Sequence, residues 1–556
     1  MKTLRFPILS IFIFSLQIST SLSAQDCYWS SHIGGTSDES AVVMGTDRSG
    51  NVYISCGTAS ESCFLNTDTL IHYGDNLSYF VKYDAEGNEV WIKSFYRPGG
   101  VFGTGGGISG IIDTIHNEII AYGNFWGMLQ LPDTTLEGPA QTIVLMKMDL
   151  DGNVIWARCA GGQGDDYAFG RAYDEQGNIY LTGVCSDSAK FEGTTIPHGG
   201  FMAKYDENGN LIWAKNKFRY SNQFPWFPYP YTDSPPFSLV YSKNKLLVNG
   251  DFYNDTIVID TITIVKYLGY MCSYVASFDT GGNIQWIRDA GGPEGVCGTQ
   301  FTTDTSGDIF ITGYFITKGI FGTDTLRVVT PGASDCFIVE YSSTGEQKWV
   351  KQLNPSISAG GRAVTTDKIG GVYLAGKFRG TAYFGNDTLT SQLPVNAFIA
   401  HLTSTGDFTG TRTYPPVYIY SFCTDNSGNL FLTGNFQDTV SLGPNTFISY
   451  GGTDIFSAKC LAITGIEEKS MPIQDQLLIY ANPTTGKCNI KIPEDFRHEK
   501  SLTLQIFDNQ GRMIQSIPVI MDQEKISFNI AAQAKGMYNA ILSNGKKRYS
   551  GKILFE

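Results

Sequence analysis

Signatures of catalysis and of metal binding are scarce in this chain. Only six histidines occur among its 556 residues, and none has the H-x-H or H-E-x-x-H spacing that is typical of metal hydrolases. No Cys-x-x-Cys pair or Cys/His cluster is available to bind zinc, and no Gly-x-Ser-x-Gly elbow is present. The sequence therefore predicts no metal site, no cofactor and no identifiable catalytic residue.

Basic charge and long apolar runs are also limited. The net charge is -13 and charged residues make up 17% of the chain, so we expect no nucleic-acid partner and no adsorption on anionic lipid. The one pronounced apolar run, residues 6–16, follows Lys2 and Arg5 and is too short to span a bilayer. Small residues ending at Ala24 come next. These features predict a secretory signal peptide over residues 1–24 and a mature chain with no transmembrane segment.

Glycine is abundant instead, at 62 residues, and much of it belongs to a repeat. The first repeated pattern is a turn, usually D-x-x-G-N, followed by alternating apolar residues that end in Gly. Alternation marks a half-buried strand, and Gly and Asn tolerate the positive φ of a tight reversal. Its copies begin at Asp47, Asp113, Asp174, Tyr241, Asp304, Asp367 and Asp425.

Two further patterns accompany the first. One is apolar-x-x-x-Thr-apolar, with threonines at Thr69, Thr135, Thr195, Thr263, Thr325, Thr388 and Thr446. The other is a strand, a turn and a strand ending in tryptophan, with Trp91, Trp156, Trp213, Trp286 and Trp349. The copy at Phe398 lacks its tryptophan, and the copy at Phe456 stops after one strand. A repeat of about 60 residues with about four antiparallel strands favours a propeller blade over a solenoid, so we expect an all-β, seven-bladed β-propeller.

The N-terminus supplies the strand that the last copy lacks. Trp29 stands at the tryptophan position of the repeat. We therefore expect the N-terminal strand to complete the last blade by pairing with residues 456–460. This pairing would make the two ends of the propeller neighbours.

The same alignment brings two cysteines together. Cys27 takes the place of Leu211, and Cys460 takes the place of Tyr205, on the two sides of a turn. Cys27 and Cys460 could form a disulfide that clasps the propeller, or they could be two unrelated buried thiols, because disulfide geometry is demanding. The total of eleven cysteines leaves at least one thiol unpaired in either case.

The three motifs resemble a known repeat. The G-N-x-Y-x-T-G strand, the F-G-x-D-T-L element and the F-x-x-K-Y-D-x-x-G-x-x-x-W hairpin are similar to the SBBP-type β-propeller repeat. The resemblance covers residues 25–463. It implies the fold and says little about function, since propellers host many roles.

A different pattern follows a polar linker at residues 464–475. Residues 476–556 contain several short strands around glycine turns, which suggests a small Ig-like β-sandwich. I-Y-A-N-P-T-T-G at residues 479–486, D-N-Q-G-R at 508–512, K-G-M-Y at 535–538 and the closing K-I-L resemble the type A sorting domain of the type IX (Por) secretion system of Bacteroidetes. Ala481 stands where that family usually has Pro.

The resemblance implies that the type IX secretion machinery is a partner, engaged through residues 476–556. It also implies a final location outside the cell or on its outer surface, with or without removal of the domain. An ordinary accessory sandwich is the alternative.

One proline-rich loop, residues 218–237, is unusually aromatic. Its aromatic residues are Tyr220, Phe224, Trp226, Phe227, Tyr229 and Tyr231. They could stack on sugar rings or bind a protein partner, or they could simply cover a neighbouring blade. No arginine cluster that would hold a carboxylated sugar is identifiable.

Three functions remain open at this point. The first is an exported binding or adhesion module for a glycan or a protein. The second is a carbohydrate-active enzyme with two acidic residues gathered at the propeller axis. The third is a structural envelope protein. The absence of catalytic signatures favours the first.

Overall fold

The computed structural model describes residues 27–556 except 59, 61, 66–67, 72–76, 97–106, 132–133, 221–237, 254, 267–270, 368–369, 386, 392–394, 415–416, 426–427, 464–476, 498–501, 509–512, 520–523 and 545–547. The chain divides into two compact units, residues 1–465 and residues 466–556. In the described ranges, no helix is long and apolar enough to cross a membrane.

The described part of the first unit contains seven antiparallel sheets of four to six strands. Sheet 1 has β2 (Glu39–Thr46), β3 (Val52–Thr58), β6 (Leu77–Tyr83) and β7 (Glu89–Phe95). Sheet 2 has β8 (Ile108–Asp113), β9 (Glu118–Gln130), β10 (Thr135–Asp149) and β11 (Val154–Ala160). Sheet 3 has β12 (Asp166–Tyr173), β13 (Ile179–Cys185), β16 (Gly199–Tyr205) and β17 (Leu211–Tyr220). Sheet 4 has β18 (Ser238–Ser242), β19 (Lys245–Phe252), β22 (Cys272–Asp279) and β23 (Ile284–Gly291).

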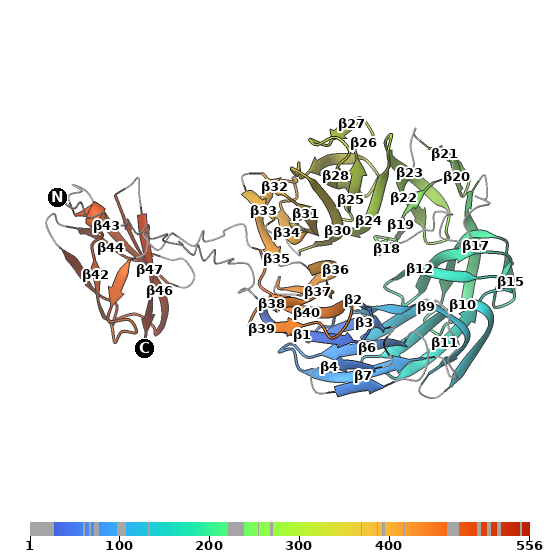
Figure 1. The fold of residues 1–556 in the computed structure, drawn as a ribbon, viewed down its shortest axis with the longest axis horizontal. Helices are drawn as coiled ribbons and strands as arrows, with labels where there is room; N and C mark the ends of the chain where they lie inside the picture. Colours follow the sequence, from blue (N-terminus) through green and yellow to red (C-terminus); the bar gives the residue numbers. More distant parts are fainter. Residues whose placement is uncertain are drawn as a thin grey trace, which may run out of the picture. The chain divides into compact units, whose positions relative to one another are not determined.

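The remaining sheets repeat this order. Sheet 5 has β24 (Val296–Thr303), β25 (Ile309–Ile316), β28 (Ser334–Tyr341) and β29 (Gln347–Gln352). Sheet 6 has β30 (Ser358–Thr366), β31 (Val372–Arg379), β34 (Asn396–Leu402) and β35 (Phe408–Tyr414). Sheet 7 has β36 (Val417–Thr424), β37 (Leu430–Phe436), β40 (Asp454–Cys460) and β1 (Cys27–Gly35). In Figure 1 the first strands that carry labels, such as β18, β24 and β30, lie nearest a common centre. We call the first strand of each of the seven sheets its inner strand: β2, β8, β12, β18, β24, β30 and β36.

The D-x-x-G-N segments form the predicted tight turns. In the turn after β6, the Asp84 carboxylate accepts hydrogen bonds from the backbone N–H groups of Glu86 and Asn88 and from the Asn88 side chain, at 2.7–3.0 Å. Gly87 has a φ of 88°, which favours glycine. The turn is therefore built by its own residues, and this explains why the same short sequence recurs.

The repeated tryptophan packs on the turn of the following sheet. A Cβ atom added to Gly209 would lie 2.8 Å from the ring of Trp156, and one added to Gly345 would lie 2.7 Å from the ring of Trp286. The Trp156 Nε1–H also donates to the carbonyl of Glu207 at 3.1 Å. The same contact of a tryptophan ring with a turn glycine joins several sheets to the next one: Trp156 with Gly209, Trp213 with Gly282, Trp286 with Gly345 and Trp349 with Gly406.

Short hairpins make a second connection between sheets, and the second strand of each carries the repeated threonine. These hairpins are β4 (Ser62–Leu65) with β5 (Asp68–Ile71), β14 (Ala189–Phe191) with β15 (Thr194–Ile196), β20 (Thr256–Ile259) with β21 (Ile262–Val265), β26 (Lys318–Phe321) with β27 (Asp324–Arg327), β32 (Thr381–Phe384) with β33 (Asp387–Thr390), and β38 (Thr439–Leu442) with β39 (Asn445–Ile448). Three of them pair with the outer strand of the preceding sheet: β4 with β1, β20 with β17, and β26 with β23. In sheet 2 the corresponding Thr135 begins the long strand β10.

The N-terminal strand belongs to the last sheet, which confirms the predicted pairing of Trp29 with the strand at Phe456. In the antiparallel pair of β1 and β40, Trp29 lies opposite Lys459, and His32 lies opposite Phe456. The Trp29 ring packs on Gly87 of sheet 1, where an added Cβ would come within 2.5 Å of it. Sheet 7 therefore contacts sheet 1 in the same way that sheet 2 contacts sheet 3, through a tryptophan ring on a turn glycine.

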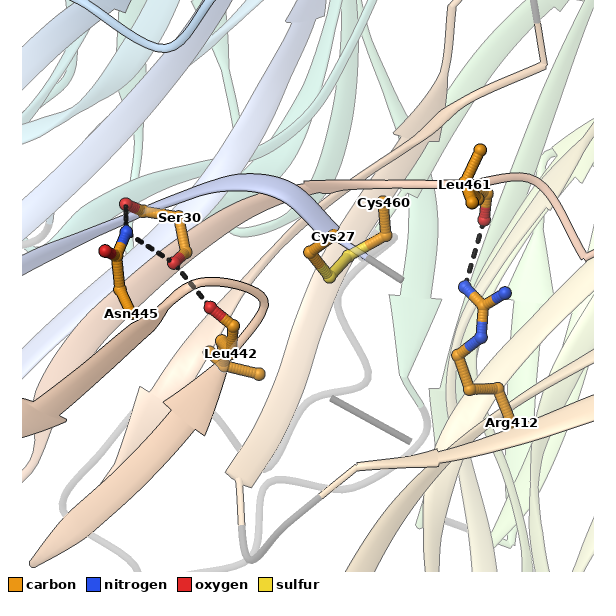
Figure 2. The surroundings of a disulfide bond; sticks show 7 residues. All are labelled: Cys27, Ser30, Arg412, Leu442, Asn445, Cys460 and Leu461. Atoms are coloured by element: carbon orange, nitrogen blue, oxygen red, sulfur yellow. Dashed lines mark hydrogen bonds between the residues drawn. A yellow bond between two sulfur atoms is a disulfide. The ribbon is translucent and has the colours of Figure 1, made fainter. Parts of the chain in front are cut away.

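A disulfide joins Cys27 and Cys460, which lie opposite each other in β1 and β40. Figure 2 shows the other contacts around it. The Ser30 hydroxyl donates to the carbonyl of Leu442 at 2.8 Å, and Asn445 donates to Ser30. Arg412 of sheet 6, whose outer strand lacks the tryptophan, donates to the carbonyl of Leu461 at 3.0 Å. The first described strand is thus held by a covalent bond as well as by its sheet.

The second unit consists of two sheets around one core. One sheet has β41 (Leu478–Tyr480), β42 (Lys487–Lys491) and β45 (Lys525–Asn529). The other has β43 (Leu502–Phe507), β44 (Met513–Val519), β46 (Gly536–Ser543) and β47 (Arg548–Phe555), and a short 3-10 helix covers Glu494–Phe496. Inward residues of both sheets form a single buried cluster that includes Ile490, Leu504 and Ile553. The arrangement is a small β-sandwich.

The N-P-T-T-G motif of the second unit lies against its last strand. The Asn482 side chain donates to the carbonyl of Lys552 at 2.7 Å and accepts from the N–H of Leu554 at 2.8 Å. Thr484 exchanges backbone hydrogen bonds with Leu554 and Glu556. The motif thus secures the C-terminal residues to the sandwich.

Candidate ligand-binding cleft

Five of the seven inner strands carry a β-bulge at the same position of the repeat. The bulged residues, which have no cross-strand partner, are Met44, Phe169, Thr299, Arg362 and Tyr420. A bulge re-aims a side chain relative to its sheet. Met44 is buried, whereas Arg362 and Tyr420 are exposed. These five repeats therefore share the β-bulge and differ in the side chain at the bulged position.

A cavity of about 490 Å³ lies between sheets 5 and 6, beside two of these bulges. Its walls come from β24, β25, β28, β30, β31 and the residue before β34. The residues lining it are Cys297, Thr299, Tyr314, Ser334, Ser358, Ala359, Gly360, Arg362, Lys377, Phe378, Arg379 and Val395. We call it the cationic cleft, because it contains three basic side chains and none of these lining residues is acidic.

The strand register explains why the basic residues meet. Lys377 lies opposite Gly360, and Arg379 lies opposite Ser358, so the two side chains are two residues apart in β31 and point to the same side. Arg362 reaches the same cavity from the bulge of β30. In the described part of the chain, none of the three forms an ion pair with a carboxylate. Their charges are therefore available to a ligand.

Close contact between sheets 5 and 6 supports the bulges. The Thr299 hydroxyl lies 3.1 Å from the carbonyl oxygen of Thr312, in its own sheet, and 3.1 Å from that of Gly361, in the next sheet. A Cβ atom at Gly361 would lie 2.1 Å from the Thr312 hydroxyl oxygen, so only glycine permits this approach. The cleft is consequently formed by strands of sheets 5 and 6 that pack directly against each other.

The wall contributed by sheet 5 is uncharged near neutral pH. Cys297 lies opposite Tyr314, and its Sγ lies 3.0 Å from the buried carboxylate of Asp251. Burial, reinforced by Asp251, raises the pKa of the Cys297 thiol well above its usual range. Burial likewise raises the pKa of Tyr314 to about 12. Both groups can therefore offer neutral polar contacts to a ligand.

The positive charges in the cleft disfavour one another. The pKa of Lys377 is lowered, first by burial of the ammonium group and then by repulsion from Arg362. Its Nζ lies 5.4 Å from the centre of the Tyr418 ring, a weak favourable contact. An anion placed between the basic side chains would relieve this repulsion, so the site is electrostatically suited to a negatively charged group.

A second cavity of about 450 Å³ also opens beside the inner strands, around Arg171, Tyr241 and Gln300. Here the guanidinium already donates to the carbonyl of Gly110 at 3.0 Å and lies over the Tyr122 ring. The carboxylate of Glu175 also lines the cavity. The positive charge of Arg171 is thus partly balanced by Glu175 in the same cavity. The second cavity is therefore less suited to an anion than the cationic cleft.

None of the sequence-derived ligand residues is among the described residues that line this cleft. Tyr220 is the last residue of β17, opposite Ile257 of β20. The other five aromatic residues, Phe224, Trp226, Phe227, Tyr229 and Tyr231, lie outside the described residues. Their role in ligand binding stays a prediction. In the described ranges, no group of three or more His, Cys, Asp or Glu residues is placed to hold a metal ion.

Reading the sequence alone missed the three basic residues of the cleft. Arg362, Lys377 and Arg379 are spread over two strands and form no compact motif. A signal did exist in the repeat alignment, where Arg362 stands at the position of Met44, Phe169 and Thr299. The repeat alignment does not reveal the bulge that re-aims the side chain at this position.

Comparison with known proteins identifies the second unit. Residues 478–556 match the family described as the secretion system C-terminal sorting domain. No curated protein matches the chain. The sorting domain shows that the protein is exported by the type IX secretion system, to the outer cell surface or beyond it.

Several solved structures are distantly similar. The extracellular domain of the putative hybrid two-component system BT4673 from B. thetaiotaomicron shares 9% identity, with 93% of this chain and 87% of that one covered and a TM-score of 0.21. Drosophila Semaphorin 1b extracellular domains 1–2 share 8%, covering 79% and 88%, with a TM-score of 0.36. Bacillus licheniformis rhamnogalacturonan lyase PL11 shares 12%, covering 80% and 84%, with a TM-score of 0.28. Similarity at this level supports no inference about function.

Proposed function

We propose that this protein is an exported seven-bladed β-propeller that acts as a binding module and captures a negatively charged ligand in its cationic cleft. The observation that carries the proposal is the cleft itself: Arg362, Lys377 and Arg379 line one cavity without a described acidic partner, in a chain whose net charge is -13. Such a concentration of unbalanced charge costs stability. A bound anion would offset that cost.

A closed, SBBP-type propeller over residues 25–463 is part of the proposal. It is supported by the seven sheets, by the pairing of β1 with β40, and by the Trp29 ring on the turn of sheet 1. A signal peptide at residues 1–24 and a linker at residues 464–475 complete the organisation. The type IX machinery would engage residues 476–556.

The alternatives have less support. A glycosidase needs a pair of carboxyl groups flanking its substrate, and the residues that line the cationic cleft include none. A purely structural envelope role gives no reason for a cavity with unneutralised cations. Binding to a glycan or to a protein therefore remains the leading function.

Thermal unfolding in the presence of small anions tests the proposal. A ligand that binds only the folded state at ten times its Kd adds about 1.4 kcal/mol of stability. We expect glucuronate to raise the Tm of the purified exported protein beyond the effect of sodium chloride at equal ionic strength. Arg362→Gln and Lys377→Gln should remove that increase.

Lys190→Gln is the matched control, because Lys190 is an exposed cation of β14 and lines no part of the cleft. It should keep the full response to glucuronate. Equal responses from wild type and both cleft variants would show that the cleft is not the anion site.

A further inference from the structure

An exposed pair of tyrosines adjoins the cationic cleft. Tyr418 and Tyr420 project from the inner strand β36 with 40% and 41% of their surfaces exposed. Their ring centres are 6.3 Å apart, and the ring planes differ by only 15°. Tyr418 also lies beside Lys377 of the cleft. Cations and aromatic rings therefore form one continuous surface across β31 and β36.

The packing of the protein does not account for this pair. Tyr420 occupies the bulge position, where sheet 1 has the buried Met44. Between the two tyrosines, Ile419 points into the core and is 2% exposed. The two tyrosine rings thus lie outside the core, nearly parallel to each other, with about two-fifths of each residue exposed.

This combination defines the chemistry of a ligand. Flat apolar faces of Tyr bind rings that are themselves flat and partly apolar, while the hydroxyl groups can exchange hydrogen bonds. The adjacent Arg and Lys side chains bind carboxylate or sulfate, and Arg does so through two parallel hydrogen bonds. A sugar unit that carries an acidic group meets both requirements, and an extended chain of such units can occupy cleft and tyrosines together.

We infer that the ligand is an anionic polysaccharide, whose acidic group enters the cationic cleft while neighbouring sugar rings lie on Tyr418 and Tyr420. This inference rests on the proposed function, because it requires the cleft to bind anions. An acidic peptide would use the basic side chains but would have no need of the paired rings. The contribution of the tyrosines therefore separates the two kinds of ligand.

Binding of four polymers to the purified exported protein, sorting domain included, tests the inference. Dextran sulfate and dextran differ only in sulfate groups, alginate carries carboxylates, and polyglutamate carries carboxylates without sugar rings. Kd values would be measured by titration calorimetry at fixed ionic strength, since salt screens charge. We expect dextran sulfate or alginate to bind and dextran to show no binding. The tighter of the two acidic polymers shows whether the cleft prefers sulfate or carboxylate.

Two sets of variants divide the site. Tyr418→Ser with Tyr420→Ser should weaken polysaccharide binding about tenfold while leaving the Tm response to glucuronate intact. Arg362→Gln should weaken polysaccharide binding about tenfold and should also remove the Tm response to glucuronate. Tyr383→Ser is the control, because Tyr383 is a half-exposed tyrosine that lies outside the cleft, and it should change neither. If the double variant has a lower Tm than wild type, Tyr420→Ser alone provides the test, because Tyr420 is the exposed residue at the bulge; it should also weaken polysaccharide binding.

Three outcomes would overturn the inference. In the first, the tyrosine variants bind the polysaccharide as wild type does, while Arg362→Gln loses binding. The cleft would then be an anion site, but the tyrosines would not bind sugar rings and the ligand would not be identified as a polysaccharide. A second contrary outcome is that polyglutamate binds as tightly as the best polysaccharide and that the tyrosine variants change neither Kd. The ligand would then be an acidic protein. If no anion binds, small or polymeric, the proposed function fails as well.

Discussion

Aspartate has two opposite roles in this protein. In the turns it accepts several hydrogen bonds near the surface: although burial opposes the shift, the bonds from Asn88 lower the pKa of Asp84. Inside the first unit, burial raises the pKa of Asp166 and Asp251 to about 6 and that of Asp335 to about 7. The same residue type therefore responds to acid in opposite directions according to its place in the repeat.

The buried aspartates should make the protein more stable in mild acid. A carboxyl group whose pKa is higher in the folded than in the unfolded state binds its proton preferentially when folded, so stability rises as the pH falls toward the unfolded pKa. Each group contributes at most about 1.4 kcal/mol per pH unit in that interval. We expect the Tm to rise from pH 8 to pH 5.5. The turn aspartates, with lowered pKa values, lose their stabilising effect only in stronger acid.

Asp335→Asn identifies the largest contributor. Its carboxylate accepts the backbone N–H groups of Cys336 and Asn354, so the variant will be less stable overall, but its gain in Tm between pH 8 and pH 5.5 should be smaller. Asp255→Asn, at an exposed carboxylate, should keep the wild-type gain. Identical pH profiles for Asp335→Asn and wild type would contradict this assignment.

At the scale of the element, a contact between tryptophan and glycine joins several of the sheets to the next one. The ring needs a residue without a side chain beneath it, and the turn needs a positive φ at the same residue. Gly345 satisfies both demands, with a φ of 81° and the Trp286 ring directly above it. One glycine thus links the local turn to the packing between sheets.

Gly345→Ala should be more damaging than an ordinary glycine substitution. Beyond the strain of positive φ, the added methyl group must displace the Trp286 ring, and such overpacking costs about 1–3 kcal/mol. Gly193→Ala is the matched control, because Gly193 has a φ of 89° and nothing within 4 Å of an added Cβ. Urea unfolding of the two variants measures the difference. Equal losses of stability would mean that the ring shifts freely.

Strand patterns were predictable at this scale because alternation and turn residues are local. The turn at Asp84 and the pairing of β1 with β40 follow from short segments whose partners occur elsewhere as complete copies. Pairing of the threonine hairpins with a neighbouring sheet was not predictable, because the edge that β20 meets is presented by β17 of the preceding repeat. The cleft was missed for a similar reason: Lys377 and Arg362 meet only through strand register and a bulge.

At the scale of the whole molecule, the described ends of the first unit are joined. Cys27 and Cys460 are 433 positions apart in the sequence, and they lie in adjacent strands of sheet 7. The remaining nine cysteines keep their thiols, and most of these residues are buried. A single covalent link therefore spans nearly all of the first unit, and an oxidising exterior favours it.

Loss of this link should lower global stability. Removing a native disulfide typically costs about 2–5 kcal/mol, mainly because the unfolded chain is no longer constrained. Cys27→Ser and Cys460→Ser should each lower the Tm and speed proteolysis starting at β1. Cys159→Ser, which removes a partly exposed free thiol, is the control. No difference in Tm between oxidised and reduced wild type would contradict a stabilising disulfide.

The position of β1 also orders events during biogenesis. Among the described strands β1 is synthesised first, yet β40, with which it pairs, is complete only at residue 460. Sheet 7 therefore stays incomplete until nearly the whole first unit has been produced. The sorting domain is synthesised later still. A chain that ends before residue 460 therefore lacks both the complete partner strand of β1 and the sorting domain that directs export.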